Sequence, residues 1–183
     1  MRTLYRILAG VAVVPPALLV AQGKPQAPAL DDAAMIGIFA SANTWNIETG
    51  SLAATRAARQ DVKDFGALLV KDHQDVLDSA RALATKLKVS PTPAAADYPL
   101  KVAHEAAMLR LKRLDGAAFD SAFLEHEAAY HKAFIEAVNK SFLPTMKSVD
   151  YKIFLEKIAP ACVAHQVAAE ELLKKKPSER GHR

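Results

Sequence analysis

Residues 61–88 read DVKDFGALLVKDHQDVLDSARALATKLK, with apolar and small side chains recurring at alternating spacings of four and three. Such spacing places these side chains on one face of an α-helix. The stripe consists of Val62, Gly66, Leu69, His73, Val76, Ala80, Leu83 and Leu87. A helix with one such stripe must bury it against other elements. The segment therefore predicts a long amphipathic helix packed against other helices.

Helical spacing recurs in three other long segments and one short segment. The further long helices are expected at Asp32–Ala58, Ala118–Phe142 and Val149–Lys175, and the short one at Leu100–Leu114. Turn-forming and proline-containing segments separate them, and Pro160 inside the last helix predicts a kink. Four amphipathic helices with short connections favour an all-α four-helix bundle, with the short extra helix in the crossover.

The composition agrees with one compact helical domain. The chain is 51% hydrophobic and 24% charged, which excludes a disordered or fibrous protein. Alanine, the best helix former, is abundant, whereas the β-branched residues that sheets favour are sparse. An all-β fold is therefore excluded.

The first residues resemble a secretory signal peptide. Arg2 and Arg6 precede an apolar run from Ile7 to Ala21, and small residues follow. The run is shorter than the roughly 20 residues of a membrane-spanning helix. We therefore interpret residues 1–23 as a signal peptide and expect a periplasmic protein with no membrane span after cleavage. An uncleaved anchor is the alternative.

The rest of the chain divides into a linker at 24–31, the bundle domain at 32–175 and a basic tail at 176–183. The net charge of +4 and the basic isoelectric point invite a nucleic-acid interpretation. However, residues 24–173 carry 17 basic and 19 acidic side chains, so the excess charge belongs to the two ends. We therefore expect no nucleic-acid partner, and no feature of the sequence identifies an oligomeric partner.

Three histidines fall on the inward stripes of three different long helices. They are His73, His131 and His165, and Glu127 lies four residues before His131 on the same helical face. A buried imidazole without a partner costs on the order of 1 to 3 kcal/mol, so each needs a hydrogen bond or a metal. The four side chains form a candidate metal site, and a histidine-rich site suits Zn, Cu or Fe rather than Mg or Ca.

Two alternatives use the same residues. In the first, the histidines form a polar network with Glu127, Tyr130, Asn43 or Asn46 that fixes helix register without metal. In the second, the protein is a ferritin-like oxidase or peroxidase, although the Glu-x-x-His pairs of such sites are missing. No phosphate loop or nucleophile elbow occurs, so no catalytic residue is assigned and an enzyme is the less favoured interpretation.

The remaining candidate residues favour structural roles. His104 and His126 are interpreted as packing or surface residues. Cys162 is the single cysteine, so the chain forms no internal disulfide, and a small buried apolar role is favoured over a metal or redox role.

Several motifs resemble a bacterial exported family called domain of unknown function 4142. The resemblance covers about residues 32–175, and its motifs lie at 42–53, 62–66, 70–73, 111–120, 127–132 and 160–165. It implies a ferritin-like four-helix bundle, usually behind a signal peptide, with no established reaction. It also implies that His73, His131 and His165 occupy positions commonly held by histidine, with Glu127 beside them.

One position departs from the family pattern. The family usually has a carboxylate where this sequence has Asn46. Because an amide is a poorer metal ligand, either Glu48 substitutes from a neighbouring face or the site is weakened.

Overall fold

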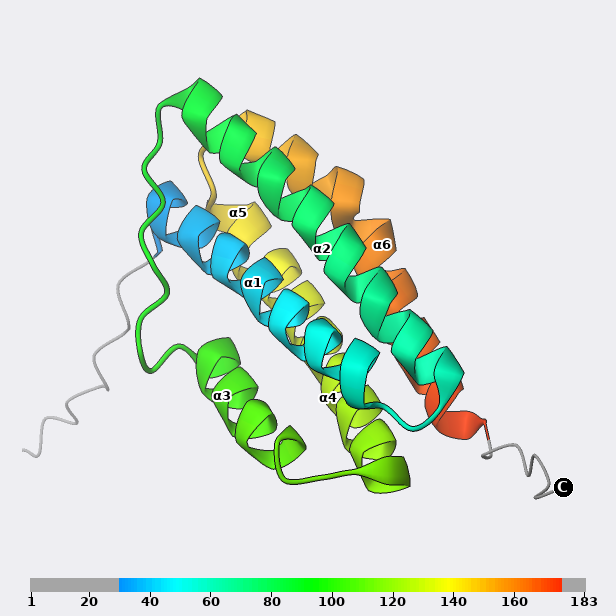
Figure 1. Cartoon of the computed structure of the whole chain (residues 1–183). Coiled ribbons are helices and arrows are strands. Elements are labelled where there is room, and N and C mark those ends of the chain that lie inside the picture. Colours follow the sequence, from blue (N-terminus) through cyan, green and yellow to red (C-terminus); the bar gives the residue numbers. More distant parts are fainter. Residues whose placement is uncertain (1–29, 176–183) are drawn as a thin grey trace, which may run out of the picture.

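The structure is a computed structural model that describes residues 30–175, and within that range it contains helices and no strands (Figure 1). The helices are α1 (Asp32–Arg56), α2 (Gln60–Leu87), α3 (Pro99–Leu111), α4 (Gly116–Ala137), η1 (Val138–Phe142), α5 (Leu143–Thr145) and α6 (Val149–Lys174). The predicted signal peptide and most of the linker lie outside the described residues, as does the basic tail. No helix between residues 30 and 175 is long and apolar enough to cross a membrane.

Two antiparallel helix pairs make up the bundle. α1 packs along α2, α4 packs along α6, and fewer contacts join one pair to the other. A long crossover links α2 to α4, and α3 lies within it on the outer side of α1 and α4 (Figure 1). The prediction of an all-α four-helix bundle with a short helix in the crossover is confirmed.

Glycines allow α1 and α2 to approach closely. A Cβ built on Gly50 would lie 2.7 Å from the carbonyl oxygen of Gly66, and one built on Gly66 would lie 2.7 Å from that of Gly50. Any larger residue at either position would force the two backbones apart.

Two carboxylates link the two helix pairs through hydrogen bonds near the ends of the helices. Asp32 at the start of α1 accepts hydrogen bonds from the backbone N–H groups of Lys147 and Ser148, each at 2.7 Å. Asp120 of α4 accepts from the backbone N–H groups of Ala58 and Arg59, at 2.8 and 2.9 Å. These bonds satisfy backbone donors that precede α6 and α2 and have no partner within a helix.

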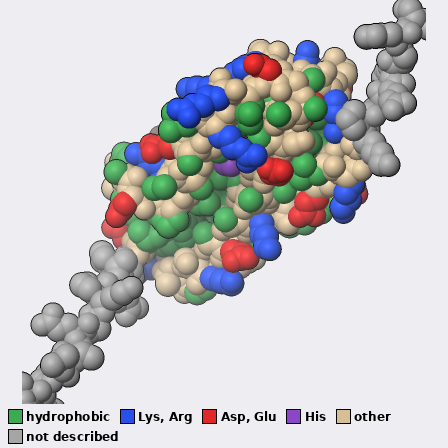
Figure 2. All heavy atoms as spheres, turned by 90° about the horizontal axis from the view of Figure 1, so that it is seen from below, with side chains coloured by type: hydrophobic (Ala, Val, Ile, Leu, Met, Phe, Trp, Pro, Cys, Tyr) green, Lys and Arg blue, Asp and Glu red, His purple; other side chains and the backbone are tan. Residues whose placement is uncertain are grey.

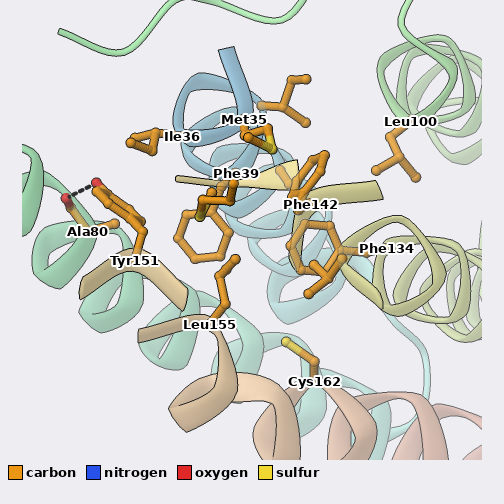
Figure 3. Packing of buried hydrophobic residues seen from close by; sticks show 14 of the residues in the cluster. Met35, Ile36, Phe39, Ala80, Leu100, Phe134, Phe142, Tyr151, Leu155 and Cys162 are labelled. Atoms are coloured by element: carbon orange, nitrogen blue, oxygen red, sulfur yellow. Dashed lines mark hydrogen bonds between the residues drawn. The ribbon is translucent and has the colours of Figure 1, made fainter. Parts of the chain in front are cut away.

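The core consists of two apolar clusters separated by a polar layer. The first cluster is built on Phe39, Phe134 and Tyr151, and the hydroxyl of Tyr151 donates to the carbonyl of Ala80 at 2.7 Å (Figure 3). The second cluster is built on residues such as Phe119. Along the long helices, buried polar side chains lie between the two clusters: Asn43, Asn46, Thr49, His73, Glu127, His131 and His165.

The region after α4 differs from the prediction of one helix from Ala118 to Phe142 and a connection at Pro144. α4 ends at Ala137, and the chain continues as the π-helix η1 and then as the single turn α5. α5 follows η1 directly, so the helical conformation continues through Pro144, which supplies no backbone N–H to the preceding turn. α6 likewise continues through Pro160.

Candidate metal centre

Three buried histidines from three helices meet in the polar layer. His73 comes from α2, His131 from α4 and His165 from α6. Each offers one ring nitrogen, and these three nitrogens all lie within 4.8 Å of one another. The Nε2 atoms of His73 and His131 are 3.3 Å apart. We call these residues the three-histidine cluster.

The tautomer of His73 follows from its outer partner. The Nδ2 of Asn43 donates to the carbonyl of Phe39 at 2.8 Å, which turns Asn43 Oδ1 toward His73. That oxygen lies 2.9 Å from His73 Nδ1 and can only accept, so Nδ1 carries the hydrogen. In the neutral ring, Nε2 therefore presents a lone pair to the cluster.

The other two rings are oriented in the same way. His131 Nδ1 donates to the backbone carbonyl of Glu127 at 2.9 Å, which leaves its Nε2 without a hydrogen. His165 Nε2 lies 3.1 Å from a carboxylate oxygen of Asp72, and its Nδ1 is buried with no hydrogen-bond partner. Each ring thus has one nitrogen held by an oxygen outside the cluster.

Two nitrogen lone pairs 3.3 Å apart cannot hydrogen-bond to each other. A proton between the rings is disfavoured because burial and the neighbouring histidines lower the pKa of His73 well below its usual value. Burial lowers the pKa of His131 to about 3. The neutral cluster therefore lacks a donor or a cation at its centre.

The arrangement matches the requirements of a metal site. Histidine ligands in proteins donate their other ring N–H to a carboxylate, a carbonyl or another oxygen, as all three do here. Two nitrogens at roughly 2.0 to 2.1 Å from one tetrahedral zinc ion are about 3.3 to 3.4 Å apart. The His73–His131 separation of 3.3 Å fits this geometry. The His165 nitrogen lies within 4.8 Å of the other two, so it would move by at most about 1.4 Å to reach the same spacing.

Glu127 lies behind His131 rather than among the converging nitrogens. Its Oε1 accepts from the hydroxyl of Thr49 at 2.6 Å, and its Oε2 lies 3.5 Å from His131 Nδ1. Burial raises the pKa of Glu127 to about 8, so the folded protein holds it protonated at neutral pH. The backbone carbonyl of Glu127 therefore orients His131, and its carboxyl Oε2 is buried beside the ring without a hydrogen-bond partner.

Thr49 was not among the residues that the sequence singled out. It is fully buried and lies three residues after Asn46, on the face of α1 that the inward Asn43 and Asn46 already mark. A stripe drawn through those two asparagines would have included it.

Asn46 and Glu48 have separate environments. Asn46 is buried, donates to the carbonyl of Ala42 at 2.9 Å and lines the same cavity as the cluster. Glu48 is half-exposed and lies 2.8 Å from Nε2 of His104, so it does not substitute for a carboxylate at position 46. His104 stacks on Trp45 and, like His126, lies outside the three-histidine cluster.

The cluster borders a small cavity of about 30 Å³, enough for about two water molecules. Apart from polar groups of the cluster and its partners, the lining is apolar: Phe39, Ala42, Val76, Tyr130, Phe134, Ile158, Ala161 and Cys162. Cys162 is buried, and burial raises the pKa of its thiol to about 11. Any ion at the cluster would thus have free space beside it.

A match to a known protein family shows which family the chain belongs to. The family model described as "Domain of unknown function (DUF4142)" matches residues 18–172. The chain belongs to the DUF4142 family. No curated protein and no solved structure matches it.

Proposed function

We propose that this DUF4142 protein binds one transition metal ion through His73, His131 and His165. The observation that supports the proposal is the meeting of three ring nitrogens with no hydrogen donor between them. The other nitrogen of each ring lies within hydrogen-bond distance of an oxygen atom, which belongs to Asn43, Glu127 or Asp72. The cluster therefore has the ligands and the surrounding hydrogen-bond acceptors of a metal site. It has no hydrogen donor of its own that could pair with the lone pairs of the converging nitrogens.

Neutral imidazoles favour zinc, copper or iron among the common biological metals. Three protein ligands leave a fourth position on a tetrahedral ion, as in zinc sites that bind water or a small ligand. The cavity beside the cluster gives that position room. We propose a periplasmic location for the protein, supported by the signal-like composition of residues 1–23.

A polar network that only fixes helix register explains the geometry less well. Hydrogen bonds account for the outer nitrogens of all three rings, yet the inner nitrogens of His73 and His131 face each other unsatisfied. The buried Nδ1 of His165 also has no partner. Such groups are costly in a core unless a ligand completes them.

A ferritin-like oxidase or peroxidase finds less support than a binding protein. The single long crossover is a connection that ferritin-like bundles also use. However, within residues 30–175 the group of converging ligand atoms contains no carboxylate. Carboxylates from four helices hold the two ions of di-iron and di-manganese bundles.

The test is metal binding by protein purified without a histidine tag and stripped with a chelator. We expect one Zn²⁺ or Cu²⁺ per chain by elemental analysis. At a free metal concentration of about 100 Kd, the ion should stabilise the fold by about 2.7 kcal/mol. For a chain of this size, that corresponds to a rise in Tm of about 5 to 10 °C.

Two variants separate the cluster from the histidines that lie outside it. His165→Gln should abolish stoichiometric binding and the rise in Tm, whereas His126→Gln should retain both, because His126 lies outside the cluster. The proposal is wrong if zinc, copper and iron all leave the wild-type Tm unchanged, or if both variants bind equally.

A further inference from the structure

A second apolar cavity lies between α4 and α6. Its volume is about 110 Å³. Asn139 is its one polar lining residue; the others are Phe134, Ile135, Val138, Leu155, Ile158, Ala159, Cys162 and Val163. Asn139, Ala159 and Val163 are exposed, so the cavity opens to solvent at these residues. We call it the α4–α6 cavity.

The α4–α6 cavity adjoins the cavity at the three-histidine cluster. Phe134, Ile158 and Cys162 line both. Figure 3 shows Phe134 and Cys162 directed into the same interior region from α4 and α6. These three side chains therefore form the partition between an apolar opening at the surface and the buried histidines.

Both helices lack a regular backbone hydrogen bond beside this cavity, although α6 stays α-helical. The π-helix η1 begins at Val138, which lines the cavity. Pro160 follows Ala159 in α6 and cannot donate a backbone hydrogen bond. The two helices therefore lack part of the regular hydrogen bonding that would hold them rigid at this point, and π-helical turns often accompany functional sites.

The lining determines what the cavity can accept. An ion entering it would lose hydration without gaining partners, which excludes charged ligands on energetic grounds. A cavity of about 150 Å³ lined by aliphatic and aromatic side chains stays dry and binds benzene or xenon. The α4–α6 cavity, at about 110 Å³, has a similar size and a similarly apolar lining, but unlike that enclosed cavity it opens to solvent.

We propose that the α4–α6 cavity binds small uncharged apolar molecules and admits them to the three-histidine cluster. Phe134, Ile158 and Cys162 line both cavities, so rotation of these side chains would join them, and the exposed Ala161 also lines the cavity at the cluster. Binding in the cavity is independent of metal. Delivery to an open position on the ion rests on the proposed metal-binding function.

The first experiment tests the cavity in the metal-free chain with xenon, followed by xenon-129 NMR. Ala159→Phe places a large side chain at the opening, and Ala164→Phe places the same side chain at an exposed position of α6 that lines neither cavity. We expect wild type and Ala164→Phe to bind xenon, and Ala159→Phe to bind it at least about tenfold more weakly. Val163→Phe should repeat this loss if Ala159→Phe does not fold. Absence of xenon binding, or equal binding by all variants, overturns the proposal.

The second experiment tests delivery with carbon monoxide and protein loaded with Cu(I), followed by the infrared band of bound carbon monoxide. Ala159→Phe should slow association at least about fivefold relative to Ala164→Phe. Copper stoichiometry should be unchanged, because the histidines are untouched. Equal association rates would overturn delivery through this cavity. If zinc, copper and iron all fail to bind while xenon binds, the proposed metal function and delivery are both wrong, and the apolar binding site stands.

Discussion

At the scale of single residues, the outer partner of each histidine decides what the cluster can do. The amide of Asn43, the backbone carbonyl of Glu127 and the carboxylate of Asp72 each hold the ring nitrogen that faces away from the cluster. This leaves the inner nitrogens as acceptors. The chemistry of the site is thus set by oxygen atoms that do not themselves converge on it.

Replacing Asn43 with Leu tests whether the outer hydrogen-bond partner of His73 sets the metal affinity of the site. The change removes the acceptor for His73 Nδ1–H and leaves that buried donor unsatisfied, at a cost of about 1 to 3 kcal/mol in the free energy of unfolding. It also frees the ring to rotate, so metal affinity should fall by about 10- to 100-fold. Competition with a coloured chelator measures the affinity. Thr44→Val is the control, since Thr44 bonds only to the carbonyl of Ala40 on its own helix. Equal affinities for the two variants would contradict the assigned role.

The stability of the metal-free protein should depend on pH through its buried and partly buried histidines. Burial, followed by the neighbouring His104, lowers the pKa of His126 to about 4 from an ordinary value of 6.5. Between these values the unfolded chain binds a proton that the folded chain does not. The contribution of His126 is therefore complete above pH 6.5 and is lost as the pH falls toward 4. His73 and His131 act in the same direction.

His126→Gln isolates this effect. Between pH 7 and pH 4 the variant should gain about 3 kcal/mol relative to wild type in the free energy of unfolding. Urea denaturation with chelator present measures the difference. Glu127, whose pKa is raised to about 8, has the opposite sign, since its contribution is complete below pH 4.5 and is lost as the pH rises through 8. Because Glu127 is present in both proteins, its effect cancels. A constant difference between the two proteins across this range would contradict the burial argument.

At the scale of helices, the spacing of apolar residues predicted the bounds of the long helices well. It predicted less well which side chains of each helix are buried. The expected second helix, Asp61–Lys88, differs from α2 by one residue at each end, because caps and turn residues mark its limits. On α1 the structure buries the polar side chains of Asn43, Asn46 and Thr49, whereas the apolar Ile47 is only partly buried. Apolar residues define a stripe on a sequence, so a face that contains buried polar groups is easily drawn off centre.

The π-helix after α4 could not be predicted from local sequence. Residues 138–142 have ordinary helical composition, so no local signal distinguishes a π-helical turn from a continued α-helix there. The sequence predicted that the three histidines face inward, but it did not predict how close together their rings lie. Their spacing depends on how the two helix pairs are set against each other, which no single helix encodes.

Gly66→Ala tests the close packing of α1 on α2. The added Cβ would lie 2.8 Å from the backbone nitrogen of Ala54 and 2.9 Å from Cβ of Ala53, so the helices must separate. Alanine gains about 1 kcal/mol in helix propensity. Overpacking of this kind costs about 1 to 3 kcal/mol, and rigid backbone contacts favour the upper part of that range, so we expect a net loss of about 1 to 2 kcal/mol. Ser51→Ala, an exposed change in α1, is the control and should stay within about 0.5 kcal/mol of wild type. A stabilised Gly66→Ala protein would show that the helices separate at little cost.

At the scale of the whole molecule, the three-histidine cluster is a contact between two structural halves. His73 belongs to the α1–α2 pair, whereas His131 and His165 belong to the α4–α6 pair. Direct contacts between the pairs are fewer than those within them. The polar layer also interrupts the apolar core where the pairs meet, since the two clusters lie on either side of it. An ion bound to all three histidines would therefore crosslink the bundle at the point where apolar packing contributes least.

Hydrogen exchange of the backbone amides tests this consequence. With saturating zinc, exchange should slow together in the middle of α2, α4 and α6, because opening either pair then requires release of the ion. Exchange in α3 should change least, because α3 lies in the crossover and contributes no residue to the cluster. His165→Gln should lose the coordinated protection. Zinc-dependent protection confined to α6 would mean that the ion binds one helix without joining the two pairs, and the crosslinking role would be wrong.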